Sequence, residues 1–259
     1  MKHPIRAAIA IIILVATVAS VGLADEAEAR DLVRAAEGHL QQHNYSAAIA
    51  ELKSAIEQNP GWFVPYSRLA VAYQAVGMNG QALVQYRHLQ HDADDLDRNI
   101  GGPGATQSRR KLITQCEAHM MLLLNHARRQ NGKTMLYSHP KIALVARDHS
   151  REMRDRRYFG HTSPLQKNRT LVDRFKRKFG FQPKCLAENL ARRWLSGGGV
   201  SLSLKNIADS HVDLLKSAGH RRNILRSGIS HFGIGIAINN NGDYWVTQVF
   251  ADLRDHPEH

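Results

Sequence analysis

The sequence contains little cysteine: Cys116 and Cys185 are the only two among 259 residues. A framework of several disulfides is therefore excluded, and at most one bridge can form. The pair lacks the CxxC spacing of a zinc clip, and neither thiol stands beside a clear base that would activate it as a nucleophile. In an oxidising compartment the two cysteines can bridge; otherwise they are small apolar side chains of the core. Spacing alone leaves both alternatives open.

The sequence also lacks a serine-hydrolase motif and has few acidic residues, and both shortages limit the functions that it can have. The sequence has no GxSxG nucleophile elbow, which removes the main sequence sign of a serine hydrolase. Acidic residues are outnumbered, since 23 Asp and Glu against 35 Lys and Arg give a net charge of +12. Such a surplus favours association with polyanions, such as lipid head groups, wall polymers or nucleic acid, and says nothing about the fold.

The N-terminus predicts export. Lys2 and Arg6 precede an uninterrupted apolar run over residues 7–24, and acidic residues follow it directly. This layout is typical of a secretory signal peptide, although the run approaches the length of a membrane anchor, so residues 1–24 are interpreted as one or the other. No cysteine follows the run, which argues against a lipid-anchored product. Outside the cytoplasm, we expect no nucleic acid as a partner.

Residues 25–95 resemble two tetratricopeptide repeats. Small and large side chains recur at an offset of thirty-four residues, which is the period of that repeat. The matching positions are Ala48, Leu52 and Ala55 in the first copy and Ala82, Tyr86 and Leu89 in the second. The second copy fits the pattern better, and a plain helical hairpin remains the alternative. If residues 25–95 are tetratricopeptide repeats, we expect them to bind a protein partner.

Two stacked repeats leave a face uncovered, so a further helix is needed as a cap. An apolar stripe at helical spacing over residues 107–130 supplies the candidate. Residues 96–108 are rich in glycine and are interpreted as a linker or hinge. A second domain is then expected over residues 109–255. If the capping helix packs on the repeats, it joins the two domains rigidly; if it does not, another subunit or partner must cover the exposed face.

The second domain has the patterns of a mixed α and β fold. A helix is predicted to begin at Pro140, with Ser138 or His139 as its cap, and His149 on its apolar stripe is interpreted as a packed core histidine. A basic amphipathic helix is expected over residues 169–178, and its charges give either a solvated face or a surface for anionic envelope lipid or polymer. Two strands are predicted near the C-terminus, joined at Gly242 by a tight turn.

Several short motifs follow one another in a specific order. They are LNxxR at residues 124–128, FGHTSP at 159–164, AEN at 187–189, GHRRNIL at 219–225, and then the strand-like runs FGIGIAI and YWVTQVF. The ordered set resembles the CAP superfamily of SCP-like extracellular proteins, over slightly more than half of the chain. That resemblance implies an α+β fold, in which the helical repeats are followed by a three-layer α-β-α sandwich.

Each of three motifs carries one polar side chain next to a residue that favours a turn: His161, Glu188 and His220. We expect them to converge on one cleft, with Gly219 ending a helix just before His220. Two imidazoles and a carboxylate can hold Zn²⁺, or can form a metal-free binding site. CAP proteins outside bacteria place a second Glu here, at about Ser217 of this chain, so the resemblance to a metal centre is incomplete.

The sequence therefore predicts an extracytoplasmic protein with two binding modules. The preferred hypothesis is non-enzymatic: the repeats hold a protein partner, and the cleft of His161, Glu188 and His220 takes a lipid, glycan or peptide. Lipid binding is implied by the resemblance alone. The alternative is a metal-assisted hydrolase of envelope peptide or ester bonds, with His161 and His220 as Zn²⁺ ligands and Glu188 as ligand or general base.

Overall fold

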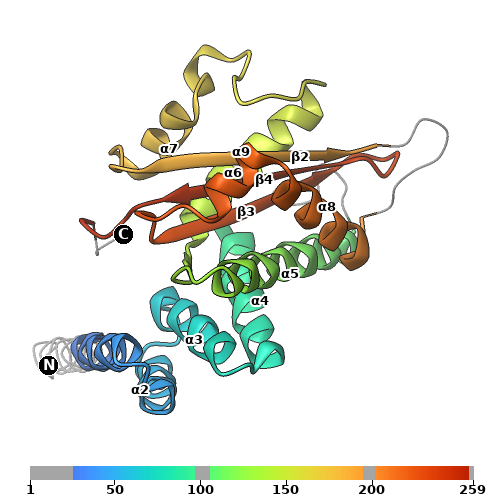
Figure 1. Ribbon diagram of the computed structural model, residues 1–259. Helices are drawn as coiled ribbons and strands as arrows, with labels where there is room; N and C mark the ends of the chain where they lie inside the picture. Colours follow the sequence, from blue (N-terminus) through green and yellow to red (C-terminus); the bar gives the residue numbers. More distant parts are fainter. Residues whose placement is uncertain (1–25, 97–105, 195–201, 257–259) are drawn as a thin grey trace, which may run out of the picture.

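A computed structural model of the chain describes residues 26–96, 106–194 and 202–256, which form a group of helices followed by a sheet with helices around it (Figure 1). The predicted signal or anchor at 1–24, most of the predicted linker, and the glycine-rich stretch at 195–201 lie outside the described residues. Within the described ranges, no helix has the length and apolarity needed to cross a membrane.

The N-terminal part is built from four consecutive helices. Residues 26–41 form the first, and the others are α2 (Tyr45–Gln58), α3 (Phe63–Ala75) and α4 (Asn79–Leu96). The side chains expected to interlock are fully buried, both in the first hairpin and in the second. Two helical hairpins are therefore present. The assignment of these hairpins to the tetratricopeptide class stays a prediction.

A four-stranded sheet lies at the centre of the second part. Its strands are β1 (Tyr137–Ser138), β2 (Leu186–Arg193), β3 (His231–Ile238) and β4 (Tyr244–Ala251), in the order β1-β3-β4-β2. The β1 strand runs parallel to β3, and the other pairs are antiparallel. The predicted turn joins β3 to β4, with Gly242 at a φ of 88° that favours glycine. Strand β2 is consequently an edge strand.

Helices cover both faces of this sheet, as the expected three-layer arrangement requires. One face packs against α5 (Gln107–Gln130), α8 (Leu204–Lys216) and α9 (Ala218–Ile224) through a core that includes Ile234 and Ile236. The other face carries α6 (Pro140–Asp155) and α7 (Leu171–Phe179), with Val249 and Ala251 from β4. A short 3-10 turn, η1 (Gln166–Asn168), precedes α7.

Local sequence accounts for where the outer helices begin and end. The His139 side chain accepts a hydrogen bond from the Lys141 backbone at the start of α6, with Pro140 in the first turn as predicted. A capping box of Thr170 and Asp173 starts α7, and Gly180 ends it in the left-handed region. The apolar side of α7 is buried and its lysines are exposed, which fits both a solvated face and a surface for anionic lipid or polymer.

Helix α5 joins the two parts. It begins at Gln107 because the Thr106 side chain accepts a hydrogen bond from the Arg109 backbone, so the end of the predicted linker is already helical. The Asn125 amide donates to the Tyr86 hydroxyl of α4 at 2.8 Å. Side chains of α3 and α4 share one hydrophobic core with α5 and the sheet. The helical part is therefore packed directly on the sheet domain, as expected of a capping helix.

Both cysteines are free thiols. Cys116 is buried on α5, where burial raises the pKa of its thiol to about 12. Cys185 lies just before β2 and is partly exposed. Of the two alternatives that the sequence leaves open, the structure has the unbridged one, and Cys116 acts as a small core side chain.

Candidate functional site

The candidate site is built at the open edge of β2. Glu188 and Asn189 are neighbours on this strand, so their side chains point to opposite faces of the sheet. Glu188 points to the face covered by α6 and α7, where it contacts Arg174. Asn189 points to the face covered by α9, where its amide donates to the backbone oxygen of His220 at 3.1 Å.

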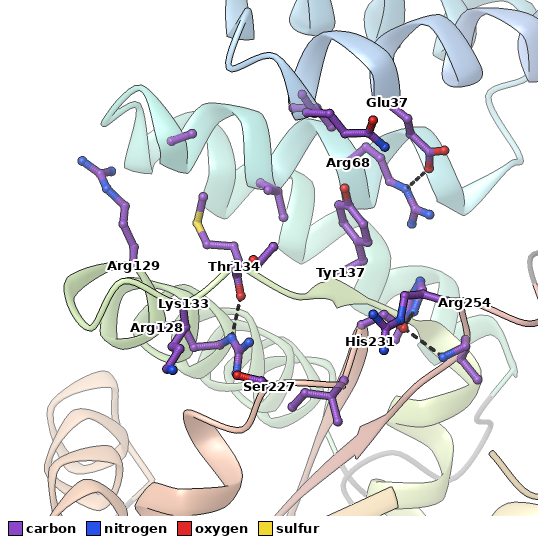
Figure 2. Close-up of a pocket in the computed structure, with 18 of the residues that line it drawn as sticks. Glu37, Arg68, Arg128, Arg129, Lys133, Thr134, Tyr137, Ser227, His231 and Arg254 are labelled. Carbon is purple, nitrogen blue, oxygen red and sulfur yellow. Dashed lines mark hydrogen bonds and ion pairs between the residues drawn. The ribbon is translucent and has the colours of Figure 1, made fainter. Parts of the chain in front are cut away.

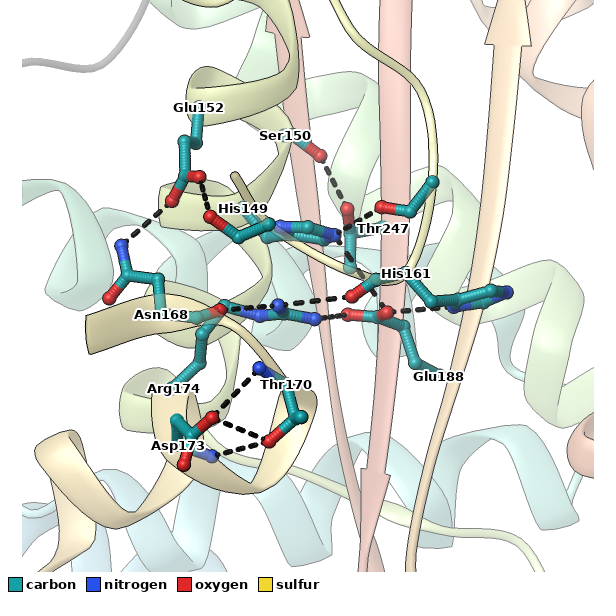
Figure 3. A network of polar contacts seen from close by, with 12 residues as sticks. His149, Ser150, Glu152, His161, Asn168, Thr170, Asp173, Arg174, Glu188 and Thr247 are labelled. Atoms are coloured by element: carbon teal, nitrogen blue, oxygen red, sulfur yellow. Dashed lines mark hydrogen bonds and ion pairs between the residues drawn. The ribbon is translucent and has the colours of Figure 1, made fainter. Parts of the chain in front are cut away.

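Glu188 is the centre of a charged cluster (Figure 3). Its side chain is only 3% exposed. One carboxylate oxygen is 2.9 Å from Nδ1 of His161, and the other accepts a hydrogen bond at 2.8 Å from the guanidinium of Arg174. Arg174 is also buried, and it donates to the backbone oxygens of His161 and Asn168 as well. The same arginine thus fixes both the carboxylate and the loop that bears the histidine.

A second carboxylate, Glu152 of α6, holds that loop in place. It accepts hydrogen bonds from the hydroxyls of Tyr158 and Ser163. It also accepts one at 2.7 Å from the amide of Asn168, as Figure 3 shows. Helix α6 ends at Asp155, and these side-chain contacts, together with backbone hydrogen bonds such as Ser163 N–H to Arg169 O, hold the segment that follows. The His161 ring is 60% exposed although its backbone is anchored. The site therefore presents a fixed imidazole to solvent.

His149 closes the inner side of the cluster. Its ring is fully buried, with Nε2 at 3.2 Å from the Gly160 oxygen and 3.8 Å from the Glu188 carboxylate. Burial lowers the pKa of His149 to about 4, more strongly than the nearby carboxylates raise it. The imidazole is consequently neutral near pH 7. The expectation of a packed, hydrogen-bonded core histidine is confirmed. His149 also packs beside Glu188 on the buried side of the site.

The same segments match a known family. The sequence model of CAP, the Cysteine-rich secretory protein family, covers residues 121–250, which is half of the chain. The chain belongs to the CAP family. This stretch contains all three predicted site residues and runs from α5 to β4.

Similar proteins are found in Bacillus subtilis and among solved structures. The chain is 29% identical over 159 residues to the uncharacterized protein YkwD and 30% identical over 128 residues to the uncharacterized membrane protein YlbC, both from strain 168. These alignments cover 61% and 49% of the chain, and 56% and 33% of the two relatives. The chain therefore spans only part of the length of the curated relatives it matches.

Two solved structures overlap the CAP domain. An extracellular protein containing a SCP domain from Bacillus anthracis str. Ames is 25% identical, with a TM-score of 0.45, over 62% of this chain and 50% of that one. An outer surface protein from Borrelia burgdorferi is 15% identical, with a TM-score of 0.42, over 51% of this chain and 89% of that one.

His220 does not join the direct contacts of the CAP domain's cluster. It lies within α9, because α8 ends at the extended residue Ser217 and a new helix starts at Ala218. The expectation that Gly219 ends the helix is therefore wrong. The His220 ring is half-buried and makes no hydrogen bond to His161 or Glu188 in the described part of the chain. Burial, and then the charge of His161, lower the pKa of His220, so the two rings interact electrostatically.

The CAP domain does not present a ready metal site here. Both oxygens of Glu188 already have partners, His161 and Arg174. Among the described residues, no three His, Cys, Asp or Glu side chains gather closely enough to hold a metal ion. Asp213, four residues before the missing second Glu, lies 58% exposed and pairs with Arg193. The donor set thus does not fit Zn²⁺ bound by His161, Glu188 and His220, and we derive no step through a metal.

The electrostatics instead favour a charged imidazole. The hydrogen bond to Glu188 raises the pKa of His161, although partial burial acts in the opposite direction. Burial alone would raise the pKa of Glu188, but the hydrogen bond from His161 and the charge of Arg174 outweigh it, and the pKa lies below its usual value. With Nδ1 occupied by Glu188, the exposed Nε2 is the atom that a ligand can reach.

Arg174 is the residue that the sequence interpretation missed. It was counted among the solvated charges of a basic helix, whereas its side chain is 4% exposed. The available signal was its position, because Arg174 lies three residues after Leu171 and directly before Phe175, on the apolar side of α7. A long cationic side chain on the buried side of a helix requires an acidic partner, and Glu188 supplies it.

We predict that Glu188→Gln lowers the pKa of His161 towards its ordinary value. The substitution removes the negative charge and leaves an amide that stabilises the protonated ring less well. The measurement is a histidine titration by NMR. Asp213→Asn is the matched control, because it removes a carboxylate of the same domain that does not contact His161.

The Glu188→Gln variant should also change how the stability of the protein depends on pH, in a direction set by the His161 pKa. Because folding raises the pKa of His161, its contribution to stability is fully present below the unfolded value of about 6.5. That contribution is lost as the pH rises through the higher folded pKa. We expect Glu188→Gln to reduce this slope in unfolding curves recorded across that window. An unchanged slope and an unchanged His161 titration would contradict the proposed pairing.

Proposed function

We propose that the protein is an exported, non-enzymatic CAP-domain protein that binds a small ligand at His161. The observation that carries this proposal is the exposed His161 ring, held at Nδ1 by a buried carboxylate that is itself anchored by Arg174. A ring fixed in this way loses little rotamer freedom when a ligand arrives. Its charged form donates a hydrogen bond from Nε2, which suits a carbonyl, phosphate or carboxylate oxygen of a lipid, glycan or peptide.

The hydrogen bonds made by the side chains around His161 favour binding over hydrolysis. Ser163, the second residue after His161, is buried and its hydroxyl donates to Glu152. No hydroxyl or thiol of the described residues is hydrogen-bonded to His161, so the imidazole has no nucleophile to activate. The metal-assisted alternative lacks a suitable set of ligands, as described above. The remaining chemistry of the site is recognition of a polar or anionic group.

The other parts of the proposal rest on the sequence and on the helical part. Export follows from the apolar run at 7–24 with its basic start and acidic end. The four N-terminal helices are proposed to hold a protein partner, supported by the thirty-four-residue offset of their buried positions. The CAP domain and these helices would then act as two binding surfaces of one rigid body.

Crosslinking in the native cell envelope, followed by mass spectrometry, tests this proposal. We expect a ligand attached to peptides near residues 161, 188 or 220 in the wild type, and its loss in His161→Ala. His126→Ala is the control, because His126 is an exposed histidine on α5 outside the cluster. Equal labelling of the His161→Ala variant would argue against the site. Recovery of a cleaved product would instead indicate an enzyme.

A further inference from the structure

A large cavity lies between the helical part and the CAP domain (Figure 2). Its volume is about 1050 Å³, at the upper end of ligand pockets. It is lined by the first helix, by α3, by the loop at 132–137, by the start of β3 and by the segment around Arg254. Because β1 and β3 lie at the other end of the strand order from β2, this cavity is separate from the Glu188 cluster.

The charges of this cavity are strongly unbalanced. Among the described residues that line it, five are arginine or lysine and one is acidic. The basic residues are Arg68, Arg128, Arg129, Lys133 and Arg254, and the acidic residue is Glu37. Arg68 pairs with Glu37 at 3.0 Å. Arg254 pairs with Asp252 at 2.7 Å. The other three basic residues have no ion pair within the described part of the chain, so the cavity carries net positive charge.

Basic side chains line two sides of the cavity, and those without an ion pair among the described residues lie on one of these sides. Figure 2 shows Arg129 and Lys133 on one side, and Arg68 with Arg254 on the other. The Arg68 guanidinium is held in place by the ring of Tyr137, whose centre lies 3.8 Å away. Because Arg68 and Arg254 already have acidic partners, the acidic groups of a ligand pair first with Arg129 and Lys133 on the other side.

Apolar side chains also line this cavity. They include Leu40, Phe63, Val64, Val71, Met135 and Ile229. The loop from Gly132 to Met135 lines the same surface, although the N–H groups of Gly132 and Lys133 and the Thr134 carbonyl already have partners within the chain. A polyanion without apolar groups would leave the apolar lining uncovered. A peptide can cover it, because acidic and apolar side chains can alternate along its length.

We propose that this cavity binds an acidic peptide segment with interspersed apolar side chains, supplied by a protein partner. The inference rests on the proposed role of the N-terminal helices in protein binding and names the chemistry of that partner. It is independent of the ligand at His161. The net charge of +12 adds long-range attraction for such a segment, which salt weakens.

The test measures binding of a labelled short peptide of alternating glutamate and leucine by fluorescence anisotropy. We expect saturable binding by the full chain, and binding about fivefold weaker for Lys133→Ala, because one partly screened ion pair is lost. The Lys133 side chain makes no hydrogen bond or ion pair in the described chain, so its removal leaves the fold intact. Lys176→Ala is the charge-matched control, because Lys176 is exposed on α7 outside the cavity.

Two changed peptides and the His161→Ala variant test whether the peptide binds in this cavity and whether it uses both charge and apolar contacts. Peptides in which glutamate is replaced by glutamine, or leucine by glutamate, should bind more weakly than the alternating peptide. Equal binding of poly-glutamate would overturn the role of the apolar lining, and equal losses in Lys133→Ala and Lys176→Ala would overturn the site. His161→Ala should bind the peptide normally. If His161→Ala loses the peptide, the peptide belongs to the Glu188 cluster, and this inference fails while the proposed function stands.

Discussion

Replacing Glu117 with leucine is expected to lower the free energy of unfolding by about 3 to 5 kcal/mol. Glu117 of α5 is fully buried and accepts from Arg147 of α6, whose side chain is 1% exposed, at 2.5 Å. It also accepts the backbone N–H of Ile236 at 2.8 Å. Strand β1 pairs only with the first two residues of β3, so this carboxylate takes the place of a neighbouring strand. The substitution removes the carboxylate that faces a buried cation and the acceptor of a buried N–H group.

Urea unfolding measures this effect, and a double variant separates its two causes. Glu117→Leu with Arg147→Met removes both charges, so the cost of burying the arginine without its carboxylate disappears and much of the lost stability should return. Recovery should be incomplete, because the Ile236 N–H still lacks its acceptor, which costs about 1 to 3 kcal/mol. A single variant as stable as the wild type would show that the pair does not hold α5 to α6.

The second large effect is expected from Gly235→Ala, at about 3 kcal/mol of lost stability. Helix α6 packs so closely on β3 that a Cβ at Gly235 would lie 2.1 Å from the backbone nitrogen of Arg147. A Cβ at Gly233 would meet the backbone of Ala143 at 2.2 Å. Backbone atoms cannot move aside like the end of a flexible side chain. The helix must therefore shift away from the sheet, and the Arg147 ion pair shifts with it.

Gly80→Ala provides the matched control. Gly80 lies in α4, and no atom lies within 4 Å of the position its Cβ would take. There the change should be neutral or should stabilise by about 0.5 to 1 kcal/mol, because alanine restricts the unfolded chain. Thermal and urea unfolding of both variants give the comparison. Similar stabilities for Gly235→Ala and Gly80→Ala would mean that α6 does not approach β3 as closely as described.

Local patterns in the sequence predicted most elements of the CAP domain correctly. Pro140 begins α6, Gly242 lies in the hairpin turn, and the apolar run after His231 forms β3. Each of these signals acts within a few residues, through a fixed φ, a cap or a repeating apolar face. The prediction at Gly219 was wrong because two helices meet at Ser217 without the left-handed glycine that usually ends a helix.

The candidate site depends on longer-range geometry. The motifs predict that His161 and Glu188 lie close together, and in the structure Nδ1 of His161 is 2.9 Å from the Glu188 carboxylate. They could not indicate that Arg174 donates to the second oxygen of the Glu188 carboxylate. They also could not indicate that the His220 backbone lies on the other face of β2. Which groups satisfy a carboxylate depends on the packing of α7 and α9 on one edge strand. That packing is not encoded in any short segment.

The sequence by itself determined the family resemblance, the order and type of the elements in the CAP domain, and an overall positive charge, because these follow from composition and from near neighbours. Only the tertiary structure decided that the carboxylate of Glu188 is shared between a histidine and an arginine instead of forming a three-ligand set with His220. It also decided that the helical part and the CAP domain enclose a basic cavity between them. Both depend on distances between residues far apart in the chain, and these are set by packing of the whole core.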